Sequence, residues 1–268
     1  MSDKRPIGVF DSGMGGLTVL SELQKKLPHE NFIYVGDTAR VPYGSRSERT
    51  VQRYSLEISE YLKKYDIKIL VIACNTATAY AESLLKKSLE IPVIGVVDPG
   101  VDALLSRTGN HCVGVIGTRS TIKSQVYEKR IKKKNENITV FSKACPLFVP
   151  IVEEGWMEHE ATKVIIADYL KPMAGEGIDS LVLGCTHYPL LKHAIQKSFP
   201  FIKLIDSSIE TASSVSKILL EKNLERKSKT VGKIQILVTD LTDQMLGLEK
   251  LFLGFGGIKI KEVKIPEE

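Results

Sequence analysis

The chain has 268 residues, enough for one large domain or two small ones, and its 43% hydrophobic content can build a core in either arrangement. Its 37 basic and 32 acidic residues give a net charge of +5, and the short lysine run 132–134 is typical of a solvated helix end rather than a nucleic-acid patch. No apolar stretch is long enough to cross a bilayer and no signal-peptide core precedes the first strand-like run, so we expect a cytoplasmic protein with neither nucleic acid nor membrane as partner.

Short apolar runs rich in β-branched residues alternate along the chain with longer segments of helical spacing. This alternation is typical of an α/β fold in which helices connect the strands of a mostly parallel sheet. In the first part of the chain it predicts helices from 17 to about 27 and from about 47 to 65, and strands at 7–10, 32–35, 69–73 and 93–97. The run 69–73 is almost wholly apolar, so we expect it to be buried on both faces.

The pattern then begins again in the second part of the chain. It predicts a helix that follows residues 117–120 and ends at about 134, a second helix over 160–170, and strands at 113–116, 138–141, 181–183 and 202–205. A polar stretch, 224–230, is a predicted linker or loop. Beyond it we expect a strand at 234–238, a helix over about 243–252 and a terminal strand at 258–263.

Two segments of the chain resemble each other. Cys74 lies 66 residues after Gly8, and Cys185 lies 71 residues after Gly114, with similar strand-like sequences at both starting points. Chance resemblance between two parallel-sheet halves is the alternative. We expect two similar α/β domains, each a mostly parallel sheet flanked by helices, formed by residues 1–97 plus 212–268 and by residues 98–211.

Three chemically active side chains come directly after predicted strands: Asp11, Cys74 and Cys185. Because ligands of open parallel sheets bind beyond the carboxyl ends of the strands, we expect these side chains to converge on one site. A cysteine there also precedes a helix, whose unpaired N–H groups and dipole favour the thiolate and lower the pKa of the thiol. The commoner fate of a cysteine is a buried core thiol, which we expect for Cys112 and Cys145.

The residues after the two cysteines are polar, which packing alone would not require: Asn75, Thr76, Thr186 and His187. His187 is placed to be a hydrogen-bond partner or proton relay for Cys185, with a structural histidine as the alternative. Asp11 is placed to do the same for Cys74, with helix capping as the alternative.

Two glycine-containing turns are suited to hold an anion. In the segment Asp-Ser-Gly-Met-Gly-Gly, residues 11–16, the glycines allow close backbone approach and Ser12 adds a hydroxyl. It lacks the Gly-Lys-Ser/Thr ending of a nucleotide P-loop and the spacing of a dinucleotide site. The turn 41–44, Val-Pro-Tyr-Gly, can also present backbone amides to an anionic group.

The chain's four cysteines include no C-x-x-C pair and no cluster with histidines at metal-ligand spacing. We therefore expect free thiols, with no disulfide framework and no metal site. The same wide spacing disfavours a thiol redox protein.

Four motifs, in this order, resemble those of the glutamate racemase family: residues 11–16, Pro-Tyr-Gly at 42–44, Ala-Cys-Asn-Thr-Ala at 73–77 and Gly-Cys-Thr-His-Tyr-Pro at 184–189. The resemblance extends through 145–150 and the Glu153-Glu154 pair, and covers roughly residues 7–210. It implies two facing α/β domains with the active site in the cleft between them, no pyridoxal phosphate or other cofactor, no metal, and a homodimer. It also implies an isomerase that supplies D-glutamate for peptidoglycan, and so for cell wall biogenesis and cell shape.

The resemblance assigns roles residue by residue. Cys74 and Cys185 match the paired acid/base thiols, with Cys74 taking the proton from D-glutamate and Cys185 from L-glutamate. Asp11 and His187 match their polar assistants, and Glu153 matches an acidic residue near the second thiol, although one sequence does not fix the register between Glu153 and Glu154. Positions that match those holding the carboxylates and ammonium of glutamate are Asp11, Ser12, Tyr43, Gly44, Asn75, Thr76, Thr186 and His187.

Inversion of a carbon centre independently requires proton removal on one face and delivery on the other, for which two bases from two halves are suited. The weakly acidic α-hydrogen also demands preorganised donors in a water-poor site, so we expect the halves to close about a hinge. Three other functions stay open: a two-cysteine racemase for aspartate or a hydantoin, a non-catalytic binding protein that keeps the anion-holding loops, and a thiol redox protein.

Overall fold

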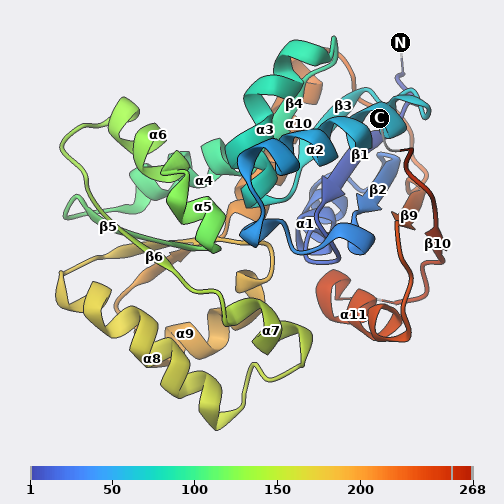
Figure 1. Cartoon of the computed structure of the whole chain (residues 1–268). Coiled ribbons are helices and arrows are strands. Elements are labelled where there is room, and N and C mark those ends of the chain that lie inside the picture. Colours follow the sequence, from blue (N-terminus) through green and yellow to red (C-terminus); the bar gives the residue numbers. More distant parts are fainter. Residues whose placement is uncertain (1, 255, 267–268) are drawn as a thin grey trace.

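The computed structural model describes residues 2–254 and 256–266, apart from the side chains of residues 244, 246 and 248. Residues 1, 255, 267 and 268, which belong to the predicted domain 1–97 plus 212–268, lie outside the described residues. Within the described part, two parallel β-sheets are each flanked by helices and lie next to one another (Figure 1). The predicted α/β class with two parallel sheets is confirmed.

The first sheet contains six strands in the described residues, in the order β10-β9-β2-β1-β3-β4, and all neighbours are parallel. Its strands are β1 (Ile7–Asp11), β2 (Phe32–Gly36), β3 (Ile69–Ile72), β4 (Val93–Gly95), β9 (Ile234–Val238) and β10 (Ile260–Glu262). Helices cover both faces, so β1, β2 and β3 are buried along their whole length. One face packs against α1 (Leu17–Lys26), α10 (Ser207–Glu221) and α11 (Asp243–Leu253), and the other against α2 (Glu48–Lys63) and α3 (Asn75–Ser88).

The second sheet contains four strands in the part of the chain that the structure describes, in the order β6-β5-β7-β8. They are β5 (Cys112–Gly117), β6 (Thr139–Ala144), β7 (Ser180–Gly184) and β8 (Lys203–Ile205). The surrounding helices are α4 (Val97–Arg107), α5 (Arg119–Lys123), α6 (Val126–Lys134), α7 (Phe148–Glu153), α8 (Glu160–Gly175) and α9 (Lys192–Ser198). Short 3-10 turns complete the chain: η1 (Thr38–Arg40), η2 (Tyr43–Ser45) and η3 (Tyr188–Leu191).

The two halves repeat one topology. The order β2-β1-β3-β4 in the first sheet matches β6-β5-β7-β8 in the second, so β1 corresponds to β5 and β3 to β7. Gly8 and Gly114 occupy matching places on β1 and β5: a Cβ at either would lie 2.7 Å from a side-chain atom of Ile67 or Ile178, respectively. The two segments that resemble each other in sequence therefore form a structural repeat, and Cys74 and Cys185 follow equivalent strands.

The C-terminal segment returns to the first sheet, where β9 pairs with β2 and β10 with β9. The buried Lys68 links the start of this segment to the first half. Its Nζ lies 2.6 Å from Glu30 Oε2 and donates a hydrogen bond to the carbonyl oxygen of Leu224 at 2.7 Å. The expected boundary between residues 211 and 212 falls inside α10. The domain ranges stay a prediction.

Some local expectations were wrong. The strand predicted at 93–97 ends at Gly95, and α4 begins at Val97, because Pro99 lies in the first helical turn, where its missing N–H costs nothing. Helices α4, α7, α9 and α10 were not predicted. Cys112, expected to be a core thiol, is only half-buried, whereas Cys145 is fully buried.

Candidate active site

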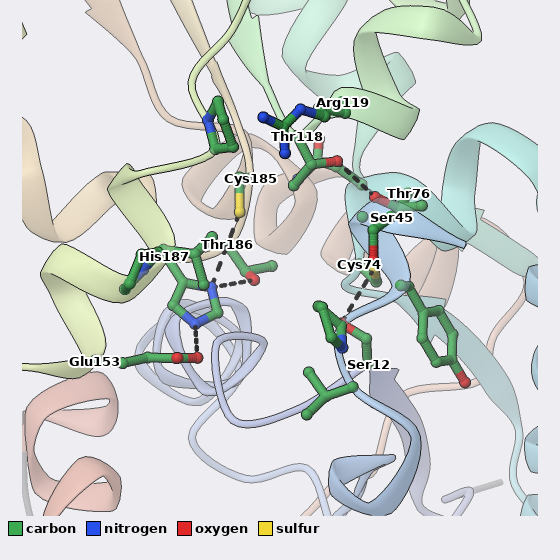
Figure 2. A pocket seen from close by; sticks show the side chains of 18 residues that line it. Ser12, Ser45, Cys74, Thr76, Thr118, Arg119, Glu153, Cys185, Thr186 and His187 are labelled. Carbon is green, nitrogen blue, oxygen red and sulfur yellow. Dashed lines mark hydrogen bonds and ion pairs between the residues drawn. The ribbon is translucent and has the colours of Figure 1, made fainter. Parts of the chain in front are cut away.

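A cavity of about 430 Å³ lies between the two halves, at the carboxyl ends of β1, β2 and β3 from the first sheet and of β5 and β7 from the second (Figure 2). This volume is typical of small-molecule sites, which span roughly 300–1,000 Å³. The lining residues are Ser12, Val41, Pro42, Tyr43, Gly44, Ser45, Cys74, Asn75, Thr76, Thr118, Arg119, Pro146, Val149, Pro150, Glu153, Cys185, Thr186 and His187. Both cysteines expected to act together are thus on one cavity, and Figure 2 shows Cys185 across it from Cys74 and Ser12.

Cys74 directly precedes α3 and caps the N-terminus of that helix. Its Sγ accepts a hydrogen bond from the Ala77 N–H at 3.4 Å and lies 3.7 Å from Ser12 Oγ. Burial raises the pKa of this thiol, and the nearby carboxyl of Asp11 raises it further, while the Ala77 and Ser12 hydrogen bonds oppose the change without cancelling it. The expected lowering by the helix terminus is therefore wrong for Cys74, which is a protonated thiol at neutral pH.

Cys185 belongs to a hydrogen-bonded chain that runs through His187 to Glu153. The His187 ring places Nδ1 3.9 Å from Cys185 Sγ and Nε2 3.0 Å from Glu153 Oε1. Burial by itself lowers the pKa of His187, but the interactions with Cys185 and Glu153 outweigh it and raise that pKa to about 10. His187 is therefore an imidazolium at neutral pH, with one N–H directed at each partner. Of the two adjacent glutamates, Glu153 lies on the cavity, whereas Glu154 is exposed.

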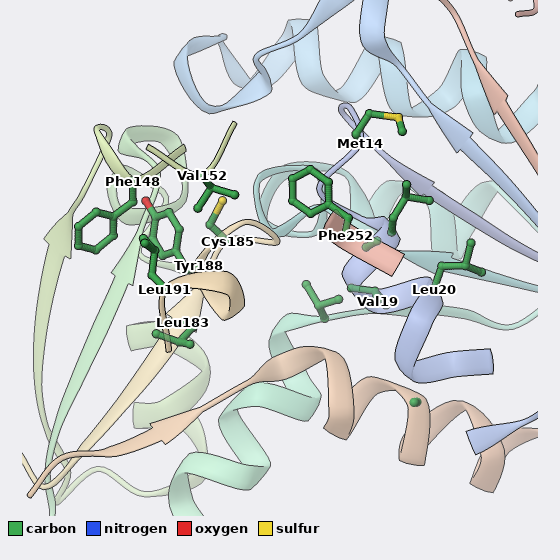
Figure 3. Packing of buried hydrophobic residues seen from close by; sticks show 14 of the residues in the cluster. Met14, Val19, Leu20, Phe148, Val152, Leu183, Cys185, Tyr188, Leu191 and Phe252 are labelled. Carbon is green, nitrogen blue, oxygen red and sulfur yellow. The ribbon is translucent and has the colours of Figure 1, made fainter. Parts of the chain in front are cut away.

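The wall behind Cys185 is apolar. One continuous cluster of buried side chains runs from α1 in the first half to η3 in the second, and Figure 3 shows Cys185 close to Val152 and Tyr188, with Met14 and Phe252 on the side of the first half. The Phe252 ring meets His187 edge-on, with centroids 5.2 Å apart. Such a wall excludes water from the Cys185 side of the cavity.

Asp11 does not line the cavity. Its carboxylate is 1% exposed beneath the loop 12–16, where Oδ2 accepts the Gly16 N–H at 2.9 Å and Oδ1 has no partner among the described residues. Burial raises the pKa of this carboxyl, against the opposing charge of His187 and the backbone N–H groups of the loop. Asp11 can therefore influence Cys74 through charge, and it reaches the cavity only through the loop that covers it.

The remaining expected ligand-holding residues all lie on the cavity, but they offer different groups. Asn75 presents an amide whose Nδ2 has no partner among the described residues. The Thr76 hydroxyl lies 3.0 Å from that of Thr118, which comes from the second half. Tyr43 donates its hydroxyl to Asp37, so only its ring and backbone face the cavity.

Several lining residues were not predicted. Thr118 and Arg119 directly follow β5, as Ser12 directly follows β1, so the rule about strand ends would have found them. Arg119 is an exposed cation at the cavity (Figure 2). Pro146, Val149 and Pro150 form an apolar side, and nothing in their residue types indicated a site.

Among the described residues, no group of three or more His, Cys, Asp or Glu side chains is arranged to hold a metal ion. All four cysteines, each within the described part, are free. In the same residues, no helix combines the length and the apolar character that a membrane crossing requires.

Comparison with known proteins places the chain among similar sequences and structures. The family model described as Asp/Glu/Hydantoin racemase matches residues 14–214. A glutamate racemase of Persephonella marina is 48% identical over 92% of this chain and 93% of that protein. The crystal structure of a glutamate racemase from Bacillus anthracis superposes with a TM-score of 0.95 at 38% identity, covering 99% of this chain and 100% of that one. The structure of a glutamate racemase from Francisella tularensis in complex with D-glutamate gives a TM-score of 0.92 at 38% identity, with 98% of both chains covered.

Proposed function

We propose, because this chain belongs to the Asp/Glu/Hydantoin racemase family, that it is an isomerase which interconverts L- and D-glutamate. Membership of the family confirms the resemblance that the four motifs indicate. Glutamate is the proposed substrate because relatives named glutamate racemases match nearly the whole chain at 43–49% identity.

The observation that carries the proposal is the position of two thiols, from equivalent strand ends of the two halves, on one small cavity. Inversion of an α-carbon needs a group that removes the proton on one face and a group that delivers a proton on the other. Cys74 and Cys185 are suited to these two roles, which a single fixed base cannot easily fill.

In the direction from L- to D-glutamate, Cys185 takes the α-proton and Cys74 supplies a proton to the opposite face. The raised pKa of Cys74 fits this direction, since the resting thiol carries the proton that it must deliver. The imidazolium of His187 faces Cys185 and is itself held by Glu153, so its orientation is set before the substrate arrives. The forward turnover leaves Cys185 protonated and Cys74 as the thiolate, and from this form the reverse reaction proceeds, with Cys74 taking the α-proton and Cys185 supplying one.

The polar groups around the thiols are proposed to hold the substrate and stabilise the charge that develops when the α-proton leaves. Donors come from the side chains of Ser12, Asn75, Thr76 and Thr186, and the backbone amides of residues 43–44 can supply more. Preorganised donors of this kind lower the barrier to proton removal because they need no rearrangement in the transition state. We propose that Arg119 attracts the distal carboxylate.

The test is circular dichroism of L- or D-glutamate incubated with purified protein without added pyridoxal phosphate or metal. We expect the signal to decay to zero from either enantiomer, and in deuterated water the product enantiomer to carry deuterium at the α-carbon. Parallel reactions with aspartate and a hydantoin test the neighbouring racemase activities. Absence of turnover with glutamate would overturn the proposal.

Two other functions predict different results for the thiols. A binding protein would keep its affinity for glutamate after alkylation of Cys74 or Cys185, whereas we expect alkylation of either to stop racemisation. A redox protein would contain a Cys74–Cys185 disulfide in its active form, which mass spectrometry of the unreduced protein detects. We expect both thiols to be free in active protein.

The wider role follows from the proposed reaction. D-glutamate would enter peptidoglycan, and so support cell wall biogenesis and cell shape, as the family resemblance implies. The four free cysteines are compatible with the reducing cytoplasm, which we propose as the location. We also propose a homodimer and two domains that close about a hinge, for which sedimentation analysis and small-angle scattering with and without glutamate are the measurements.

A further inference from the structure

The amide of Asn75 is satisfied on one side only. Its Oδ1 accepts a hydrogen bond from the Tyr127 hydroxyl at 2.6 Å, whereas its Nδ2 is buried without a partner among the described residues. The side chain is 3% exposed and lies on the cavity. A buried donor without a partner is costly, so an unfilled N–H at a cavity indicates an acceptor that arrives with the ligand.

Tyr127 reaches Asn75 from the other half of the molecule. It lies on α6 beside the second sheet, whereas Asn75 begins α3 beside the first. The ring is 2% exposed and packs against Gly184, where an added Cβ would lie 3.2 Å from Tyr127 Cε2. Gly184 directly precedes Cys185, and Asn75 directly follows Cys74. Tyr127 therefore contacts a neighbour of each thiol.

The direction of the hydrogen bond can be assigned. Burial raises the pKa of Tyr127, so its phenol is neutral and has a single proton to donate. The phenol lies at hydrogen-bond distance from the Asn75 amide oxygen, which can only accept, so the phenol proton is directed at Asn75 Oδ1.

We infer that Tyr127 is a positioning residue that holds the Asn75 amide with its NH₂ group toward the cavity. A carboxylate accepts hydrogen bonds and donates none, so a flipped amide would place Oδ1 against it and repel it. The hydrogen bond from Tyr127 opposes that flip and keeps a donor ready for the substrate's carboxylate. This inference rests on the proposed function, which makes glutamate the ligand.

The main variant is Tyr127→Phe, which removes the hydroxyl and keeps the ring. We expect kcat/KM for glutamate to fall roughly tenfold in both directions, as for the loss of one net hydrogen bond of about 1 kcal/mol or slightly more. Thermal unfolding establishes that each variant is folded.

The matched control is Tyr80→Phe. Tyr80 also donates its hydroxyl from one half to the other, from α3 to the Ser120 carbonyl at 3.1 Å, but it does not contact Asn75. If Tyr127 acted only by joining the halves, the two phenylalanine variants would lose similar activity. We expect Tyr80→Phe to keep kcat/KM within about twofold of wild type.

A double-mutant cycle separates positioning from general structure. In an Asn75→Ala background, where no amide is left to orient, Tyr127→Phe should change kcat/KM by less than about twofold. A full tenfold loss in that background, or a Tyr127→Phe enzyme as active as wild type, would overturn the inference. A wild-type protein that does not racemise glutamate would instead overturn the proposed function, and the two failures are distinguishable.

Discussion

Gly15, in the loop after β1, lies directly against His187 and Thr186 of the second half. A Cβ added there would lie 2.5 Å from Cε1 and Nδ1 of His187 and 2.5 Å from Oγ1 of Thr186. Gly13, two residues earlier in the same loop, would place its Cβ no nearer than 3.4 Å, from Val41. Gly15→Ala therefore inserts a methyl group where no room exists, and Gly13→Ala makes only an ordinary contact.

The neighbours of Gly15 cannot yield easily. The ring of His187 is bonded to Glu153 at 3.0 Å, and the carbonyl of Thr186 accepts the Thr18 hydroxyl at 3.0 Å. The ring and the loop must therefore separate by about 1 Å, at a cost of about 1–3 kcal/mol for an overpacked site. Because a misplacement of about 1 Å in a catalytic group costs about 100-fold in rate, we expect activity to fall by about two orders of magnitude.

Initial rates of racemisation by circular dichroism, together with urea unfolding, measure both effects. Gly15→Ala should lose stability and activity together, and Gly13→Ala should stay within about 1 kcal/mol and severalfold of wild type. A Gly15→Ala protein with wild-type rate and stability would mean that the halves do not meet here in the active form, which would refute this reasoning.

The other predictions concern the thiols and the charges around them. Cys74→Ala and Cys185→Ala should each reduce racemisation by at least about 10³-fold, and full activity in either variant would contradict the two-base mechanism. Glu153→Gln should lower the pKa of His187 by about 1, a modest change because the Glu153 side chain is partly exposed to solvent. An NMR titration of the His187 ring protons measures it. Because this pKa is raised from 6.5 to about 10, the associated stability is complete below pH 6.5 and is lost as the pH rises through about 10, so the urea stability of wild type and variant should converge over that window. An unchanged His187 titration in the variant would refute the contact. Arg119→Gln should raise KM for glutamate roughly threefold at low salt with little change in kcat, and a KM equal to that of wild type at low salt would exclude the proposed attraction.

Much of the fold could be predicted because its signals are local. The apolar runs that became β1, β3, β5 and β7 are visible in the sequence, and the rule about strand ends led directly to Cys74 and Cys185. Helices α9 and α10 follow the short strands β7 and β8, and they were missed. The strand at 93–97 was predicted two residues too long because Val93–Val97 has the composition of a strand throughout.

Residue types and their order along the chain were enough to determine the parallel α/β class, the internal repeat, the pair of thiols and the family, because periodicity and motif spacing are properties of the chain itself. The protonation of Cys74, the burial of Asp11 beneath its loop, and the bond from Tyr127 to Asn75 were decided only by the tertiary structure. Each depends on desolvation or on a contact between distant segments. The charge of a group buried between two halves is set by the surroundings that the fold assembles around it.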